Sequence, residues 1–135
     1  QSKMSANTYV MDKAGTKFSI QHILEKHKNK VILIDFWASW CKPCIKELPF
    51  SVRLHHKFSN KKVVFIYLSL DKNFSDWENS GREIQSEEEN YIVLNSFDSP
   101  IAKNLKIVGI PRYVLIDKQS AIISADTPRP SDLRI

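Results

Sequence analysis

Two cysteines, Cys41 and Cys44, are the residues of this chain best suited to chemistry, and they stand three positions apart. They are the only two cysteines among the 135 residues. A structural role for a bridge between them is weak, because closing so short a loop gains about 2 kcal/mol before the strain of a tight ring is subtracted. Two thiols at this spacing can interconvert with a disulfide. The pair therefore predicts thiol-disulfide chemistry.

The segments on either side of the pair predict the elements that position it. Residues 31–36 form an apolar run typical of a strand buried on both faces. An amphipathic helix is expected from Cys41 to about Asn60, with a kink at Pro49, and a second buried strand over 63–70. Strand, helix and strand at this spacing form a right-handed βαβ unit. The first cysteine would then begin the helix at the carboxyl end of the first strand, where open α/β sheets bind ligands.

Further elements are expected on both sides of this unit. They are a hairpin over 9–11 and 17–20, a helix over 21–27 capped by Ser19, a polar surface helix over 74–88, a strand over 91–94, a helix over 100–105, and a hairpin over 112–117 and 121–124. We expect one α/β domain over residues 1–135, with 1–29 as an N-terminal extension. A last helix beginning at 128–132 is expected to be cut short, and Gln1 to mark a processed or truncated start.

Cys41 is expected to be the nucleophile of the pair. At a helix N-terminus, unpaired backbone N–H groups and the macrodipole stabilise a thiolate, and Lys42 adds a positive charge. Cys44 lies one turn deeper on the same face, where it can resolve a mixed disulfide. Pro43 cannot donate a backbone hydrogen bond and stiffens the ring between the two sulfurs.

Asp35 is a second candidate, because it interrupts the first apolar strand six residues before Cys41. Burying an unpaired carboxylate is costly, and burial raises the pKa of the group. One interpretation is an acid paired with a lysine. The other is a proton acceptor for Cys44 when the mixed disulfide resolves.

Composition disfavours several other classes. The net charge of +5 arises from 20 basic and 15 acidic residues that are interspersed, which favours a solvated surface over a nucleic-acid site. No run approaches the roughly 20 apolar residues needed to span a bilayer. A structural zinc site needs four ligands, and the adjacent His55 and His56 lack the spacing of a zinc finger. We therefore expect no metal.

The stretch from Asp35 to Cys44 resembles the thioredoxin active-site segment. Pro49 matches the helix-kinking proline of that family, and residues 109–111 match the loop that bears its cis-proline. The resemblance covers about residues 30–124. It implies a thioredoxin-like fold, with a central mixed sheet flanked by helices and here an N-terminal β-hairpin extension. It also implies a redox-active disulfide that needs no external cofactor.

Within this superfamily the chain resembles the TlpA/ResA-like proteins of bacterial extracytoplasmic spaces. The residues that carry the likeness are 47–49, Leu70 with Asp71, and 113–117. In such proteins a glutamate at the position of Glu47 tunes the chemistry of the cysteine pair, so Glu47 is a second candidate acid. The alternative interpretation, which we weigh equally, is that Glu47 is an ordinary solvated residue of the helix. Such domains often form the C-terminal part of longer chains. The resemblance implies the periplasm or another extracytoplasmic space, while Asp35, where the group often has Asn, keeps a cytoplasmic location open.

These observations predict a protein-disulfide oxidoreductase, acting as a reductase on disulfides of partner proteins. The family pattern implies a cis Pro111 beside Cys41 and a substrate strand paired with the Ile110 backbone, and Arg112 adds a cation near the substrate groove. The expected substrate-binding residues are Trp40, Lys42, Pro43, Ile110, Pro111 and Arg112. We expect a monomer without a nucleic-acid partner, and the electron donor is left open. A peroxidase is disfavoured, because peroxiredoxins usually have Thr or Ser three residues before the attacking cysteine, where this chain has Ala38. A redox-inert binding module is disfavoured because both cysteines of the pair are present.

Overall fold

The structure is a computed structural model, and it describes residues 7–58, 62–84 and 89–132. A seven-stranded mixed sheet in the order β2-β1-β5-β4-β3-β6-β7 forms its centre. The strands are β1 (Tyr9–Met11), β2 (Lys17–Ser19), β3 (Val31–Trp37), β4 (Val63–Ser69), β5 (Glu89–Val93), β6 (Arg112–Ile116) and β7 (Ile122–Ser124). The helices are α2 (Ile20–Lys26), α3 (Lys42–Lys57), α4 (Phe74–Glu78) and α5 (Pro100–Asn104), with 3-10 turns η1 (Ser96–Asp98) and η2 (Pro130–Asp132).

The predicted βαβ unit is confirmed. β3 and β4 pair in parallel from Val31 opposite Val63 to Trp37 opposite Ser69, and α3 connects them. Both strands are buried along most of their length, as expected for parallel strands covered on two faces. Pro49 lies inside α3, as the sequence predicted.

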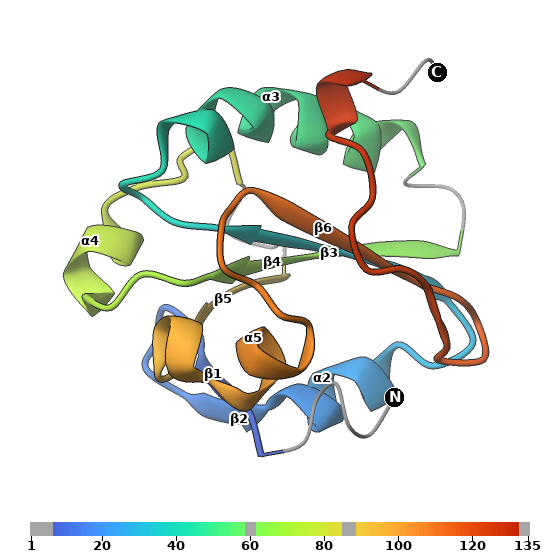
Figure 1. Cartoon of the computed structure of the whole chain (residues 1–135), viewed down its shortest axis with the longest axis horizontal. Coiled ribbons are helices and arrows are strands. Elements are labelled where there is room, and N and C mark those ends of the chain that lie inside the picture. Colours follow the sequence, from blue (N-terminus) through green and yellow to red (C-terminus); the bar gives the residue numbers. More distant parts are fainter. Residues whose placement is uncertain (1–6, 59–61, 85–88, 133–135) are drawn as a thin grey trace.

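Helices cover both faces of the sheet (Figure 1). α3 lies on one face, and its apolar side packs into a core that includes Cys44, Leu48 and Leu54. α2 and α5 lie on the opposite face, over a second core that contains Ile23 and Ile101. The sheet thus separates two apolar layers, and the cysteine pair belongs to the α3 layer.

The N-terminal hairpin extends the sheet beyond β5. β1 pairs antiparallel with β2 and with β5, so the hairpin covers the edge that β5 would otherwise expose. Ser19 caps α2, because its side chain accepts a hydrogen bond from the His22 N–H. The predicted hairpin and the predicted cap are both confirmed.

The helix predicted over 74–88 is wrong in length. α4 ends at Glu78, and the predicted residues 85–88 lie outside the described part. Gly81, three residues after the end of the helix, has φ +66, a left-handed conformation that ends a helical path. The short helix lies at the surface, with Ser75, Asp76 and Glu78 exposed, but the fully buried Trp77 anchors it in the core.

The C-terminal third brings a loop to the cysteine pair. β6 pairs antiparallel with β3, with Tyr113 opposite Asp35, and therefore places the loop before Arg112 near the N-terminus of α3. The predicted strand over 91–94 is present as β5. The expected helix start at 128–132 is the 3-10 turn η2, which lies beside α3 (Figure 1).

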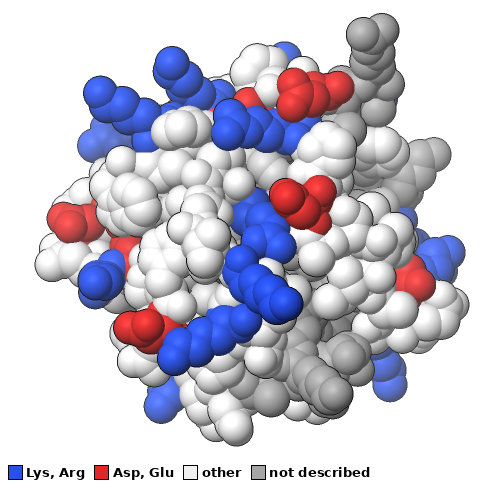
Figure 2. Space-filling view, viewed as in Figure 1, with Lys and Arg blue, Asp and Glu red and all other residues white. Residues whose placement is uncertain are grey.

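Basic side chains gather along one rim and in a band across the face shown in Figure 2, with acidic groups between them. This interspersion agrees with a solvated surface and not with a field of one sign. Within the described ranges, none of the helices is long and apolar enough to cross a membrane.

Candidate redox site

The cysteine pair stands where β3 passes into α3. Cys41 is the N-cap residue of α3, and Pro43 occupies its first turn. A proline is tolerated there because the first backbone N–H groups of a helix have no partner within the helix. The local sequence therefore starts the helix at the cysteine, and the sheet fixes the direction in which that helix leaves.

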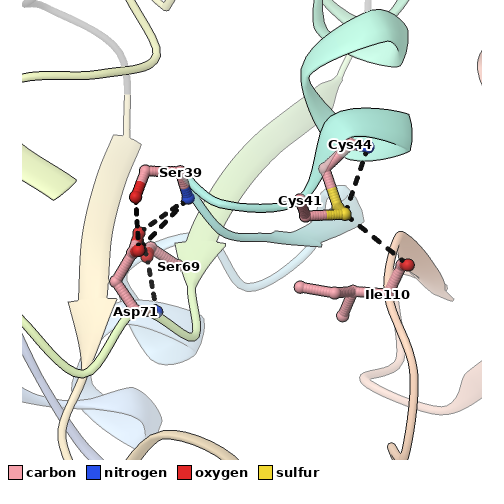
Figure 3. Close-up of a disulfide and its surroundings, with 6 residues drawn as sticks. All are labelled: Ser39, Cys41, Cys44, Ser69, Asp71 and Ile110. Atoms are coloured by element: carbon pink, nitrogen blue, oxygen red, sulfur yellow. Dashed lines mark hydrogen bonds between the residues drawn. A yellow bond between two sulfur atoms is a disulfide. The ribbon is translucent and has the colours of Figure 1, made fainter. Parts of the chain in front are cut away.

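Cys41 and Cys44 are joined by a disulfide with their Cα atoms 5.2 Å apart. The Cys44 backbone N–H donates to the Cys41 sulfur at 3.2 Å, and the carbonyl oxygen of Ile110 lies 3.6 Å from the same sulfur (Figure 3). Both cysteines are buried. A sulfur that accepts a backbone N–H at a helix N-terminus is stabilised as a thiolate, so the geometry favours Cys41 as the attacking group.

Exposed apolar side chains stand close to the pair in the sequence, together with the exposed Lys42. Trp40 is 60% exposed and its ring lies 6.3 Å from that of Phe97, measured between centroids. Val108 is 94% exposed, and Ile110 is partly exposed. The peptide bond from Ile110 to Pro111 is cis. Exposed apolar side chains next to a reactive group are typical of a surface that contacts another protein.

Asp35 lies fully inside the protein, beneath α3. The Ser51 hydroxyl, from that helix, donates to its carboxylate at 2.9 Å. The pKa of Asp35 is raised from 3.8 to about 7, chiefly by burial; the Ser51 hydrogen bond opposes this shift, and the negative charge of Glu47 contributes to it. In the part of the chain that the structure describes, no lysine or arginine forms an ion pair with Asp35, which disfavours the paired-acid interpretation.

Glu47 is also buried, and its carboxylate is held by Ser131 from the C-terminal turn η2. Cys44, Glu47 and Ser51 follow one another at helical spacing, so they lie on the same side of α3. Glu47 is therefore not a solvated helix residue. In the part of the chain that the structure describes, the Glu47 carboxylate accepts its side-chain hydrogen bonds from Ser131.

Arg112 forms hydrogen bonds within the protein. Its guanidinium donates to the carbonyl oxygens of Ala125 at 2.7 Å and Leu105 at 2.9 Å, and more weakly to Lys106 at 3.5 Å. The side chain is 16% exposed and lies 3.7 Å from the Asp126 carboxylate. These bonds tie β6 to the end of α5 and to the segment after β7. A direct role in the substrate groove stays a prediction.

Sequence reasoning did not single out Asp71 for the site. Its buried carboxylate accepts hydrogen bonds from the Ser39 N–H at 3.0 Å, the Ser39 hydroxyl at 2.6 Å and the Ser69 hydroxyl at 2.6 Å (Figure 3). Leu70 adds a backbone bond to the Trp37 carbonyl at 2.7 Å. The end of β4 thus holds the loop that leads to Cys41. The sequence did contain a signal for Asp71, because this acid directly follows the apolar run of residues 63–70.

The fold and this site together define a thioredoxin-like protein with a dithiol-disulfide pair. Residues 29–122 match the thioredoxin-like family Thioredoxin_8, and the chain belongs to that family. The predicted fold class and family resemblance are thereby confirmed.

Named relatives agree with this assignment. Thiol-disulfide oxidoreductase ResA of Bacillus cereus is 30% identical over 129 residues, which covers 90% of this chain and 66% of the relative. The chain therefore spans slightly less than two thirds of that protein. A crystal structure of a candidate thiol-disulfide oxidoreductase from Bacteroides vulgatus is 34% identical, with a TM-score of 0.77 and coverage of 92% of this chain and 83% of that one. A solution structure of such a protein from the same organism is 38% identical, with a TM-score of 0.75 and coverage of 95% and 81%.

Proposed function

We propose that this protein exchanges a dithiol and a disulfide with partner proteins through Cys41 and Cys44, and that it acts as a reductase. The observation that carries the proposal is the Cys41 sulfur at the N-cap of α3, where it accepts the Cys44 N–H. Proteins similar to this chain are described as thiol-disulfide oxidoreductases, which supports the same activity.

The reaction divides into two exchanges. In the reduced protein the Cys41 thiolate attacks one sulfur of the client disulfide, forms a mixed disulfide and releases the other client sulfur as a thiolate that takes up a proton. The Cys44 thiol then loses its proton and attacks Cys41. The Cys41–Cys44 disulfide forms, and the second client sulfur leaves as a thiol. Two electrons pass to the client in this cycle, and a dithiol donor must restore them.

Asp35 serves as the proton acceptor for Cys44. A carboxyl with a pKa of about 7 exists in both forms near neutral pH, so it can take and return a proton at working pH. Ser51 holds it beneath the face of α3 that also carries Cys44. Because Cys44 is buried, an internal base is needed to remove its proton.

The client is a protein segment that docks on the surface around the pair. Trp40, with Lys42 and Pro43, forms one side of this surface, and Ile110 with Pro111 forms the other. The Ile110 carbonyl, close to the Cys41 sulfur, is available to pair with an extended client strand. We place Arg112 behind this loop, which it holds through its carbonyl contacts.

The proposed direction and location of the reaction rest on the resemblance to the TlpA/ResA-like group that the sequence carries. We propose a reductase in an extracytoplasmic space such as the periplasm, in which the chain is the redox domain of a longer protein. Its potential should then lie nearer to that of thioredoxin, about −270 mV, than to that of a strong oxidant, about −120 mV. Equilibration with glutathione buffers measures the value.

Reduction of insulin with a dithiol donor tests the activity. Cys41→Ser should abolish turnover, because the nucleophile is lost. Cys44→Ser should accumulate a mixed disulfide with insulin, because only resolution is blocked. Asp35→Asn should leave the first exchange nearly unchanged and slow resolution at neutral pH. Equal turnover in wild type and Cys41→Ser would refute the proposed function.

A further inference from the structure

Glu47 has an unusual partner for a buried carboxylate. Both of its oxygens accept hydrogen bonds from one residue, Ser131, whose N–H donates at 3.1 Å and whose hydroxyl donates at 2.6 Å. The two residues are 84 positions apart in the sequence. Two bonds from one donor residue fix both the position and the orientation of a carboxylate.

The carboxylate held in this way lies close to the proposed proton acceptor. Glu47 precedes Ser51 by one turn of α3, and Ser51 donates directly to Asp35. Beside burial, the charge of Glu47 raises the pKa of Asp35. The strands next to β3 place Tyr67 and Tyr113 opposite Asp35 in register, and burial raises the pKa of Tyr113, so this tyrosine stays neutral at working pH.

The donor belongs to a separate part of the fold. Ser131 lies in η2, which packs beside α3 near the end of the described chain (Figure 1). Pro130, next to it, is buried and anchors the turn. Arg129 adds a cation here, which acts on the pKa of Tyr113. No other hydrogen bond to the Glu47 carboxylate is found in the described ranges.

We propose that Ser131 is a positioning residue of the redox site, which holds the Glu47 carboxylate beside Asp35 and so makes the docking of η2 on α3 part of the proton-transfer machinery. This inference rests on the proposed role of Asp35 as the proton acceptor. It extends the site beyond the βαβ unit, to a turn that lies far from the cysteines in the sequence.

Loss of the Ser131 hydroxyl should lower the pKa of Asp35. Without the shorter of its two bonds, the Glu47 side chain can turn toward solvent, where its charge is screened. The like charge next to Asp35 then weakens, and ionisation of Asp35 becomes easier. We expect a fall of about one unit for Glu47→Gln and about half a unit for Ser131→Ala.

Carbon-13 NMR titration of the Asp35 carboxyl in the oxidised full chain measures this shift directly. Ser131→Thr keeps a hydroxyl and should restore the wild-type value. Ser124→Ala is the matched control, since Ser124 lies on the same C-terminal stretch and its hydroxyl accepts from Asp126 N–H, not from Glu47. In a Glu47→Gln background, Ser131→Ala should produce no further shift. A merely structural role of Ser131 would lower the unfolding temperature without this dependence on Glu47.

The outcomes separate this inference from the proposed function. A shift in Glu47→Gln together with an unchanged or raised midpoint in Ser131→Ala would overturn the role of Ser131 and leave the oxidoreductase intact. The role of Ser131 is also overturned if Ser131→Ala shifts the pKa of Asp35 equally in the wild-type and Glu47→Gln backgrounds. It is overturned as well if Glu47→Gln leaves the pKa of Asp35 unchanged. An Asp35 that titrates near 3.8 in wild type would overturn the acceptor assignment and this inference with it, whereas insulin reduction tests the function independently.

Discussion

Replacing Asp35 by asparagine should change how the stability of the protein depends on pH. The carboxyl has a pKa of about 7 in the folded protein, against 3.8 when it is exposed to water. The folded state therefore binds this proton more tightly than the unfolded state does. Folding is unaffected by the group below about pH 3, where it is neutral in both states. As the pH rises toward 7, the Asp35 carboxyl ionises first in the unfolded state. This ionisation stabilises the unfolded state relative to the folded state.

The size of the effect follows from the shift. About three pKa units at about 1.4 kcal/mol each amount to about 4 kcal/mol. The wild-type protein should lose that much unfolding free energy between about pH 3 and pH 8, most of it between about pH 4 and pH 7, with no further loss above about pH 8. In Asp35→Asn this loss should be absent. Contributions of the titratable groups that do not interact with Asp35 are common to both proteins and cancel in the difference.

Urea unfolding of the oxidised proteins, followed by circular dichroism at several pH values, measures this difference. Oxidation removes the titration of Cys41 and Cys44 from the comparison. Asp76→Asn is the control, because Asp76 is exposed and should give a profile parallel to that of wild type. If the stability of Asp35→Asn relative to wild type stays constant within about 1 kcal/mol from about pH 4 to 8, the argument from burial is refuted.

Three further changes test other parts of the site. Asp71→Ala should lower the unfolding free energy by about 3 kcal/mol, because the loop before the cysteines loses its buried acceptor; urea unfolding checks this, and a loss below about 1 kcal/mol would contradict it. Arg112→Lys should cost about 2 kcal/mol, since an ammonium cannot serve the separated carbonyls that the guanidinium fork reaches, and unchanged thermal unfolding would count against that role. Gly81→Ala should cost about 3 kcal/mol, because the residue has φ +66 and a Cβ there would lie 2.5 Å from the Trp37 ring. Gly109→Ala, with nothing within 4 Å of the added atom, is its control in the same unfolding assay.

The parts of the fold that were predictable are those determined by neighbouring residues. The apolar run of β3, the helical stripe of α3 and the apolar run of β4 follow one another directly, so their periodicity indicated the βαβ unit and the position of Cys41. The cap at Ser19 is equally local. Each of these predictions depends on residues within one or two turns or one strand.

α4 shows where local reasoning fails. The polar residues after Phe74 resemble a surface helix, but Trp77 is drawn into the core, and its indole N–H donates to Asn90 at 3.2 Å. Gly81 then turns the chain close against the Trp37 ring. Both interactions depend on tertiary contacts, which overrode the local helix pattern.

The supporting residues of the site were hidden for a similar reason. Asp71 acts on Ser39, which is 32 positions away, and Ser131 acts on Glu47 across 84 positions. No sequence motif relates residues at either of these separations. Arg112 could be recognised as a cation beside the proline loop, but the carbonyls that receive its hydrogen bonds become neighbours only when β6 and β7 join the sheet.

The contact between the Cys41 sulfur and the Ile110 carbonyl spans 69 positions of the chain, and this has a consequence for the order of folding. During synthesis the βαβ unit with both thiols is complete well before β6 is made, and pairings of such high contact order form late. A nascent chain thus carries its reactive cysteines for a period without the loop that lies against them in the native protein. In that period the thiols are open to wrong partners, so the oxidation state in which the chain is synthesised should influence its yield of active protein.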